Sequence, residues 1–163
     1  MNENIRSFDP SDWEEVNIIY QQGLDTNLAT FQTTCPTFEE WDNSHLSIGR
    51  YVYVQDGHVV GWAALTPVSS RCVYSGVAEV SVYIADFMRY KGVGTQLLKK
   101  VIEASEAHGI WTLQSGIIAE NTASISLHKK CGFREVGYRE KIARDSRGEW
   151  RNTVLLERRS AFI

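Results

Sequence analysis

Apolar side chains near the start of the chain recur at the spacing of an α-helix. On one face of this helix lie Trp13, Val16, Ile19 and Tyr20. Asp9-Pro10 precedes them and favours a helix start, because Asp accepts backbone N–H groups and Pro removes only an unpaired donor. The pattern predicts a helix from Pro10 to near Gln22, followed by a loop over residues 28–36.

A second helix is predicted after this loop. Thr37 and Glu40 form a capping box, in which the two side chains satisfy backbone donors at a helix N-terminus. The helix is expected to run through Trp41 and His45, before a segment of alternating apolar and polar residues begins.

Alternation and β-branched residues predict the strands. Residues 51–55 and 58–66 flank Asp56-Gly57, a turn dipeptide that tolerates positive φ at both positions and joins two strands in a hairpin. Further strands are predicted at residues 76–84, 111–119, 133–142 and 151–157.

Two further helices are interleaved with these strands. One, at residues 93–108, ends at Gly109, and the other, at residues 122–131, ends at Gly132, since glycine is the favoured C-terminal cap. The element order is β-α-α-β-β-β-α-β-α-β-β. This order predicts an α/β (α+β) fold in which helices cover the faces of a mixed sheet.

The composition is that of one globular domain. The chain has 163 residues, of which 43% are hydrophobic and 23% charged, so we expect a single domain over residues 1–163. No apolar run approaches the roughly 18 residues that cross a bilayer, and no membrane partner is expected. The first ten residues lack a basic region followed by an apolar stretch, so a cytoplasmic location is the default.

Charge and cysteine content narrow the partners. The formal net charge is -3, with both signs scattered along the chain, and without a basic stripe nucleic acid is not expected to bind. Cys35, Cys72 and Cys131 are widely spaced and lack ligand patterns. We therefore expect neither a disulfide framework nor a metal site, and interpret the cysteines as packing residues.

A glycine-rich loop lies between a predicted strand and the third predicted helix. It reads Arg89-Tyr-Lys-Gly-Val-Gly94. Glycine lets the backbone bend tightly, so that N–H groups and the positive end of a helix dipole converge on a phosphate. The loop matches neither a Walker loop nor a Rossmann fingerprint, because Gly94 is followed by Thr95, Gln96 and Leu97. Taken alone, it fits equally well a helix start that binds nothing.

A second segment, one strand further on, adds to this pattern. It reads Asn121-Thr-Ala-Ser124-Ile-Ser-Leu-His128-Lys-Lys-Cys-Gly132-Phe133. An Arg/Gln-x-x-Gly-x-Gly/Ala loop, followed by an Asn that opens a short helix ending in Gly-Phe, resembles the GCN5-related N-acetyltransferases, or GNAT enzymes. The resemblance covers about residues 5–156 in element order. It implies the GNAT fold, a mixed central sheet of about seven strands flanked by about four helices.

The same resemblance implies acetyl-CoA as the co-substrate. The residues implied to bind the pyrophosphate of coenzyme A are Tyr90, Lys91, Gly92, Val93, Gly94 and Thr95. The residues implied to offer strand backbone to the pantetheine arm, where the strand splays from its neighbour, are Val82, Tyr83 and Ile84. Asn121 and Ser124 are implied to contact the arm from the neighbouring helix start.

Within this superfamily the chain looks similar to the phosphinothricin and methionine sulfone or sulfoximine acetyltransferases. The passages that carry the similarity are Ala29-Thr-Phe31, Arg71-Cys-Val-Tyr74, Glu79-Val-Ser-Val-Tyr-Ile84, Ser126-Leu-His128-Lys and Gly148-Glu-Trp-Arg-Asn152. Gln32 and Asn152 stand where an acidic residue is usual, and Ser69-Ser70 replaces a bulkier basic context. The similarity implies an N-acetyltransferase that acts on the amine of a small, amino-acid-like molecule.

Two residues are candidates for proton transfer. Acetyl transfer needs an uncharged amine, whereas an α-amino group titrates near about 7.7 to 8.0, so a proton acceptor helps. Glu79 is the candidate base, since burial among its valine neighbours would raise its pKa. Its other interpretations are an acid at the sheet surface and a member of a structural ion pair. His128 stands where relatives carry a tyrosine or histidine that acts as acid or base. Without the family, a lone histidine in this context is more often an ordinary helix residue.

Arg71 is the candidate clamp for a carboxylate or phosphinate of the acceptor, and its alternative is a solvated surface arginine. The residues expected to shape the pocket with Glu79 are Phe31, Tyr74, Val80 and Ser81. One acid paired with Arg71 suits a zwitterion better than a polyamine or aminoglycoside. A protein N-terminus as acceptor, and a non-catalytic coenzyme A-binding module, remain the alternatives. The aromatic-rich chain and the family habit favour a homodimer.

Overall fold

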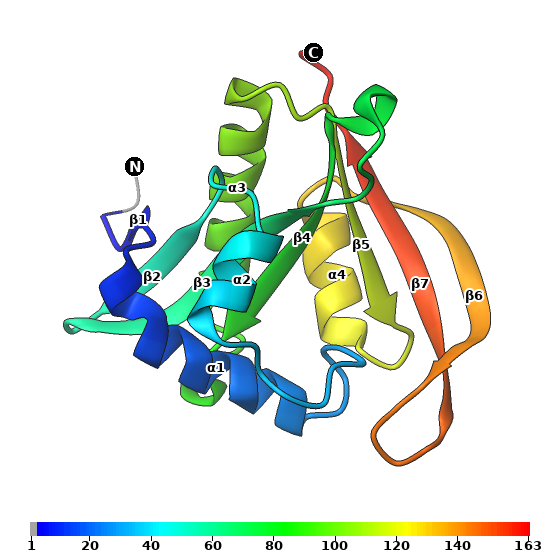
Figure 1. Ribbon diagram of the computed structural model, residues 1–163, viewed down its shortest axis with the longest axis horizontal. Helices are drawn as coiled ribbons and strands as arrows, with labels where there is room; N and C mark the ends of the chain where they lie inside the picture. The colour runs from blue at the N-terminus through cyan, green and yellow to red at the C-terminus, as the bar shows by residue number, and fades with distance from the viewer. Residues whose placement is uncertain (1–2) are drawn as a thin grey trace.

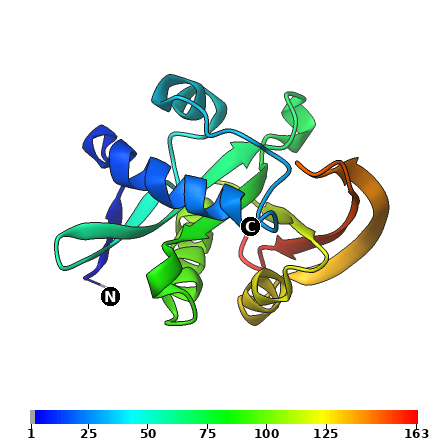
Figure 2. The same ribbon diagram turned by 90° about the horizontal axis from the view of Figure 1, so that it is seen from below.

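Seven strands form one mixed sheet in the computed structural model, which describes residues 3–163. In chain order the elements are β1 Ile5–Ser7, α1 Trp13–Asp25, α2 Phe38–Ser44, β2 Tyr51–Gln55, β3 His58–Pro67, β4 Val77–Ile84, α3 Val93–Ala107, β5 Thr112–Ile118, α4 Thr122–Lys130, β6 Arg134–Arg144 and β7 Trp150–Arg159. The strand order across the sheet is β1-β2-β3-β4-β5-β7-β6 (Figure 1). Helices α1 and α2 cover one face and α3 and α4 the other (Figure 2). The predicted fold class and element order are confirmed.

The ends of the first helix and the first hairpin follow from local chemistry. Asp9 is the N-cap of the first turn, and its Oδ1 accepts the backbone N–H of Ser11 at 2.9 Å. A 3-10 turn at Pro10–Asp12 comes before α1, which continues three residues beyond the predicted end at Gln22. Asp56 and Gly57 have φ values of 52° and 79°, as the tight turn between β2 and β3 requires.

Strands β4 and β5 are parallel and separate after a short contact. Only residues 77–79 of β4 pair with residues 112–114 of β5, whereas β5 stays paired with β7 along its whole length. Figure 1 shows the two strands diverging toward their C-terminal ends. The edge of β4 at residues 80–84 therefore has backbone groups that β5 does not cover.

The core has an aromatic layer on one face of the sheet and an aliphatic layer on the other. Trp41 and Trp62 are each 1% exposed, and the Trp62 ring stacks on Tyr83 with 4.8 Å between centroids. Under α3, Leu97 and Leu98 are fully buried. Each such side chain stabilises the fold by about 1.5–3 kcal/mol.

Helix α1 lies close to β4 at Gly23. A Cβ atom on Gly23 would lie 2.5 Å from two carbons of the Tyr83 ring. Glycine inside a helix costs about 1 kcal/mol relative to alanine. The close approach to Tyr83 explains why glycine occupies this position despite that cost.

The three cysteines are free and differ in exposure. Cys131 is buried and Cys35 half-buried, whereas Cys72 is exposed. The interpretation as packing residues is therefore wrong for Cys72, because it lies in an exposed 3-10 turn at Cys72–Tyr74. No helix within residues 3–163 is long and apolar enough to cross a membrane.

Candidate functional site

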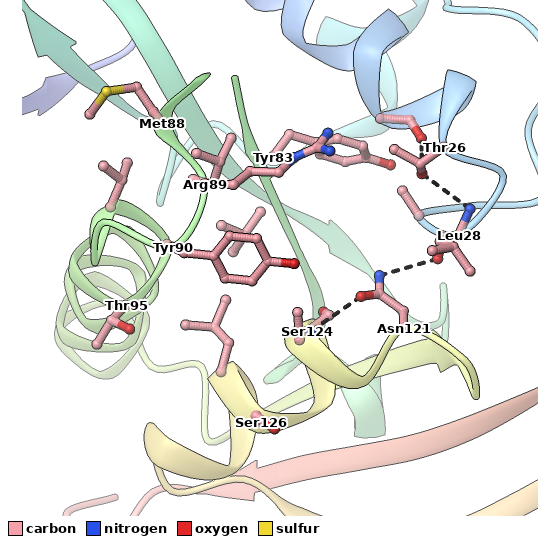
Figure 3. Close-up of a pocket in the computed structure, with 18 of the residues that line it drawn as sticks. Thr26, Leu28, Tyr83, Met88, Arg89, Tyr90, Thr95, Asn121, Ser124 and Ser126 are labelled. Carbon is pink, nitrogen blue, oxygen red and sulfur yellow. Dashed lines mark hydrogen bonds between the residues drawn. The ribbon is translucent and has the colours of Figure 1, made fainter. Parts of the chain in front are cut away.

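A cavity of about 510 Å³, called the large cavity below, lies beside the C-terminal half of β4. Its other walls are the glycine loop, the starts of α3 and α4, and the end of α1 with the loop that follows (Figure 3). The predicted coenzyme A residues that line it are Val82, Tyr83, Ile84, Tyr90, Gly92, Val93, Gly94, Thr95, Asn121 and Ser124. Lys91 is exposed and is not among the lining residues.

The glycine loop has the geometry of an anion-binding turn. Tyr90 and Gly92 have φ values of 62° and 83°. Gly92 is the N-cap of α3 and provides no side-chain cap, so the first N–H groups of the helix remain available to a ligand. The positive φ of Tyr90 costs about 1–2 kcal/mol in an L-residue. Such strain is typical of functional turns.

Glycine at position 94 allows α3 and α4 to approach each other. A Cβ atom on Gly94 would lie 3.1 Å from Cδ2 of Leu127 in α4, tighter than ordinary carbon contacts of about 3.5–4.0 Å. A larger residue here would push the two helices apart. The loop therefore fits a phosphate group. Glycine is favoured at position 92 by the positive φ and at position 94 by the close approach of α4.

Asn121 connects two walls of the large cavity, the start of α4 and the loop after α1. Its Oδ1 accepts the N–H of Ser124 at 3.2 Å and so caps α4. Its Nδ2 donates to the carbonyl of Leu28 at 3.2 Å (Figure 3). The side chain therefore holds the loop after α1 against the start of α4.

A second cavity of about 300 Å³, the small cavity, adjoins the first. Residues that line both are Ala29, Val82, Tyr83, Asn121 and Ser124. The structure brings Phe31, Glu79, Val80, Ser81 and His128 together in its wall. Among the described residues that line it, Glu79 is the only one with a formal charge when His128 is neutral.

Arg71 and Tyr74 lie outside both cavities. Both are exposed, Arg71 as the N-cap of the 3-10 turn and Tyr74 at its end. The structure therefore does not bring these two residues together with Glu79 and His128. Their predicted contact with the acceptor stays a prediction.

His128 is buried with one nitrogen unpartnered. The residue is 3% exposed, and its Nδ1 lies 2.7 Å from the carbonyl oxygen of Ser124. Because a carbonyl only accepts, Nδ1 must carry the proton and Nε2 the lone pair. Within residues 3–163, Nε2 has no hydrogen-bond partner. Desolvation lowers the pKa of His128 below its usual value, so the imidazole is neutral at pH 7 and Nε2 can accept a proton.

Glu79 is half-buried beside its neighbour on β5. The amide Nε2 of Gln114 donates to its Oε2 at 3.2 Å, because residues 79 and 114 are register partners where β4 and β5 still pair. The last paired position before the strands separate thus places the carboxylate in the wall of the small cavity.

Tyr20 and Gln32 also line the small cavity, and the sequence did not predict this. The Tyr20 hydroxyl donates to Oε1 of Gln32. Burial raises the pKa of Tyr20 to about 12, so it remains a donor at neutral pH. Tyr20 shares the periodic pattern of the helix core, and nothing in that pattern distinguishes a cavity residue from a packing residue.

Comparison with known proteins identifies the family. The model of the Acetyltransferase (GNAT) family matches residues 13–133. The chain belongs to this family. The resemblance inferred from the glycine loop and the Asn121 helix is thereby confirmed. This acetyltransferase is an enzyme that transfers an acetyl group from acetyl-CoA to an amine.

Relatives of this acetyltransferase include enzymes of known acceptor. Phosphinothricin N-acetyltransferase of Alcaligenes faecalis is 30% identical over 161 residues, covering 94% of this chain and 81% of that protein. The L-methionine sulfoximine/L-methionine sulfone acetyltransferase of Pseudomonas paraeruginosa is 27% identical over 163 residues, covering 96% and 94%. Among solved structures, ribosomal-protein-alanine N-acetyltransferase from Brucella melitensis has a TM-score of 0.88 and 28% identity, covering 96% of this chain and 99% of that one.

Proposed function

We propose that this acetyltransferase acetylates the amine of a small amino-acid-like acceptor, of the phosphinothricin, methionine sulfone or methionine sulfoximine type. The observation that carries the proposal is the junction of the two cavities. Val82 and Ser124 line both, so a donor in the large cavity and an acceptor in the small one can meet beside Glu79 and His128.

Acetyl-CoA fits the large cavity in this proposal. The uncapped N-terminus of α3 suits its pyrophosphate, with Lys91 adding positive charge nearby. The uncovered edge of β4 suits the amide groups of its pantetheine arm. Asn121 and Ser124 contact the arm from α4. When bound, acetyl-CoA supplies the acetyl group as a thioester.

Both candidate residues act on the acceptor's amine in this proposal, Glu79 by its charge and His128 by proton transfer. The carboxylate of Glu79 attracts the acceptor's ammonium group into the small cavity, directly or through water. Nε2 of His128 is a free base at neutral pH and accepts the proton that the amine must lose. The protonated imidazole can then donate that proton to the departing thiolate of coenzyme A.

The size and charge of the small cavity support a small acceptor. Its volume of about 300 Å³ lies at the lower end of ligand sites. A polyamine or an aminoglycoside carries several positive charges, and a single carboxylate matches them poorly. Relatives named for phosphinothricin and for methionine sulfoximine point the same way. The proposal keeps Arg71 as the group that binds the acceptor's carboxylate or phosphinate, although its side chain lies exposed outside both cavities.

A homodimer in the cytoplasm is also part of the proposal. Strand β6 is the sheet edge, and its hairpin with β7 displays exposed apolar side chains: Val136, Tyr138, Ile142 and Trp150. Such a patch is typical of a protein interface. Three free cysteines suit a compartment that keeps thiols reduced.

The test is thiol release from acetyl-CoA with a panel of acceptors. The panel contains phosphinothricin, methionine sulfone, methionine sulfoximine, ordinary amino acids, spermidine, an aminoglycoside and a peptide with an N-terminal alanine. We expect turnover on the first three, abolished in His128→Ala while the Kd of acetyl-CoA is unchanged. Turnover confined to spermidine, the aminoglycoside or the peptide would overturn the proposed acceptor and leave the family assignment intact.

A further inference from the structure

The loop between α1 and α2 forms part of the small cavity without regular secondary structure. Its residues 29–32 line the cavity, yet residues 26–37 belong to neither helix nor strand. A loop that shapes a binding site must be held by contacts of its own, because ordering each residue costs about 1–2 kcal/mol. The contacts of Asn27, at the start of this loop, come from a distant part of the chain.

Asn27 is tied to the hairpin formed by β6 and β7. It adopts a left-handed conformation with φ of 56°. Its Nδ2 donates to Oδ2 of Asp145 at 3.0 Å, and its backbone carbonyl accepts from Arg151 at 3.1 Å. Its Oδ1 accepts the hydroxyl of Ser146 at 3.3 Å. Figure 2 shows the end of this hairpin beside the loop that follows α1.

Asp145 is the centre of this cluster. Its side chain is 1% exposed. Oδ1 accepts the backbone N–H groups of Arg147 and Glu149 at 2.9 and 3.0 Å, whereas Oδ2 accepts from Asn27 and, at 3.0 Å, from Arg151. Burial alone would raise the pKa of this carboxyl, but these hydrogen bonds hold its pKa well below the usual range. Asp145 is therefore ionised at neutral pH.

Arg151 also connects the cluster to the segment just before α4. Its side chain is 11% exposed and also contacts Glu120 at 3.3 Å. Glu120 directly precedes Asn121, which lines both cavities. Oδ1 of Asp145 accepts hydrogen bonds within the hairpin turn, whereas Oδ2 accepts those from Asn27 and Arg151. Each oxygen of the carboxylate therefore has a different role. Because a buried ion pair adds little net stability, fixing one conformation is the role tested for this pair below.

We propose that Asp145, Asn27 and Arg151 form a positioning cluster that sets the acceptor loop at residues 29–32. These residues touch neither cavity themselves, so they act through the loop. The cluster fixes the position of Thr30, Phe31 and Gln32 in the wall of the small cavity. It thereby sets the affinity for the acceptor. The inference rests on the proposed function only in assigning the small cavity to the acceptor.

Asp145→Asn is the sharpest test, because it keeps the shape of the side chain. The oxygen that remains still accepts from Arg147 and Glu149, whereas the new amide turns a donor toward Asn27 and Arg151. We expect the acceptor KM to rise about tenfold, equal to about 1.4 kcal/mol. The kcat should change by less than about threefold, as expected when binding rather than the chemical step is affected. Amide hydrogen exchange over residues 26–36 should accelerate in the same variant.

Two further variants keep the result interpretable. Asn27→Gly retains the left-handed backbone and the Arg151 bond, and should raise KM and exchange to a smaller extent. The double variant Asn27→Asp with Asp145→Asn restores a donor facing an acceptor and should recover much of the affinity. Glu135→Gln is the control, since Glu135 lies on β6 of the same hairpin and pairs with Lys129 at 2.7 Å, with both side chains about half exposed. This control variant should change neither the acceptor KM nor the hydrogen exchange over residues 26–36.

The outcomes separate this inference from the proposed function. Hydrogen exchange reports on the loop whatever the acceptor is, and KM is measured with the acceptor that gives the highest turnover in the panel. A lower Tm for Asp145→Asn, with unchanged exchange over residues 26–36 and an unchanged acceptor KM, would overturn the positioning role. Absence of turnover in the wild type would count against the proposed function alone.

Discussion

The close approach of α1 to Tyr83 gives a sharp prediction for Gly23→Ala. The added Cβ would lie 2.5 Å from the Tyr83 ring, about 1 Å short of ordinary carbon contact. The ring cannot turn aside freely, because Trp62 stacks on it at 4.8 Å and Tyr20 at 4.9 Å. The helix or the ring must therefore shift.

The magnitude follows from two opposing effects. Overpacking a buried site costs about 1–3 kcal/mol, whereas alanine gains about 1 kcal/mol of helix propensity over glycine. With about 2 kcal/mol of strain, the net loss is about 1 kcal/mol, and the Tm falls by about 3 °C in a domain of this size. The effect on catalysis is larger. Tyr83 lines both cavities, and a displacement near 1 Å lowers kcat/KM by about tenfold to a hundredfold.

The assay combines thermal unfolding with steady-state kinetics on acetyl-CoA. Gly137→Ala is the control, since a Cβ there meets nothing within 4 Å and no positive φ is recorded for it. It should leave both quantities nearly unchanged. A Gly23→Ala enzyme with a Tm equal to or above wild type and an unaltered kcat/KM would refute the reasoning, since only the helix propensity would then be felt.

Three further predictions concern the base, the core and the exposed arginine. Because the pKa of His128 is lowered, the unfolded chain takes up a proton near pH 6.5 that the folded protein resists, so stability falls as the pH drops below about 6.5. In His128→Gln the Tm should depend less steeply on pH between about 5 and 6.5, and an unaltered slope would contradict the assignment. Leu97→Ala should lower the unfolding free energy by about 3 kcal/mol, since Leu97 is fully buried; chemical denaturation measures this, and a loss below about 1 kcal/mol would show that the core closes around the gap. Arg71→Ala should raise the acceptor KM far more than it changes kcat, and an equal KM would remove Arg71 from the site.

The helices, strands and glycine loop could be predicted because their signals are local. A capping Asp9, the Asp56-Gly57 turn and the periodic residues of α3 each act within a few residues. The residues predicted to bind the co-substrate were identified from two motifs whose spacing is typical of the family. The structure places all of them except Lys91 in the wall of the large cavity.

The rest depends on contacts between distant segments. Asn27 and Asp145 are 118 positions apart, and no pattern near either residue indicates the pair. Arg71 and Tyr74 lie at the two ends of a 3-10 turn whose orientation no local pattern in the sequence predicts. Both residues are close to β4 in sequence, yet both lie outside the two cavities. Cys72 shares that turn and is exposed for the same reason.

The separation of β4 from β5 also links the proposed co-substrate site to the stability of the fold. Where β5 leaves, residues 80–84 of β4 form an unfinished edge inside the sheet, which is a weak point in a fold and a template for unwanted strand pairing. A bound co-substrate can complete that edge, and a ligand present at about 100 times its Kd adds about 2.7 kcal/mol of stability. If acetyl-CoA binds there as proposed, the enzyme saturated with it should therefore unfold and be proteolysed more slowly than the enzyme without it.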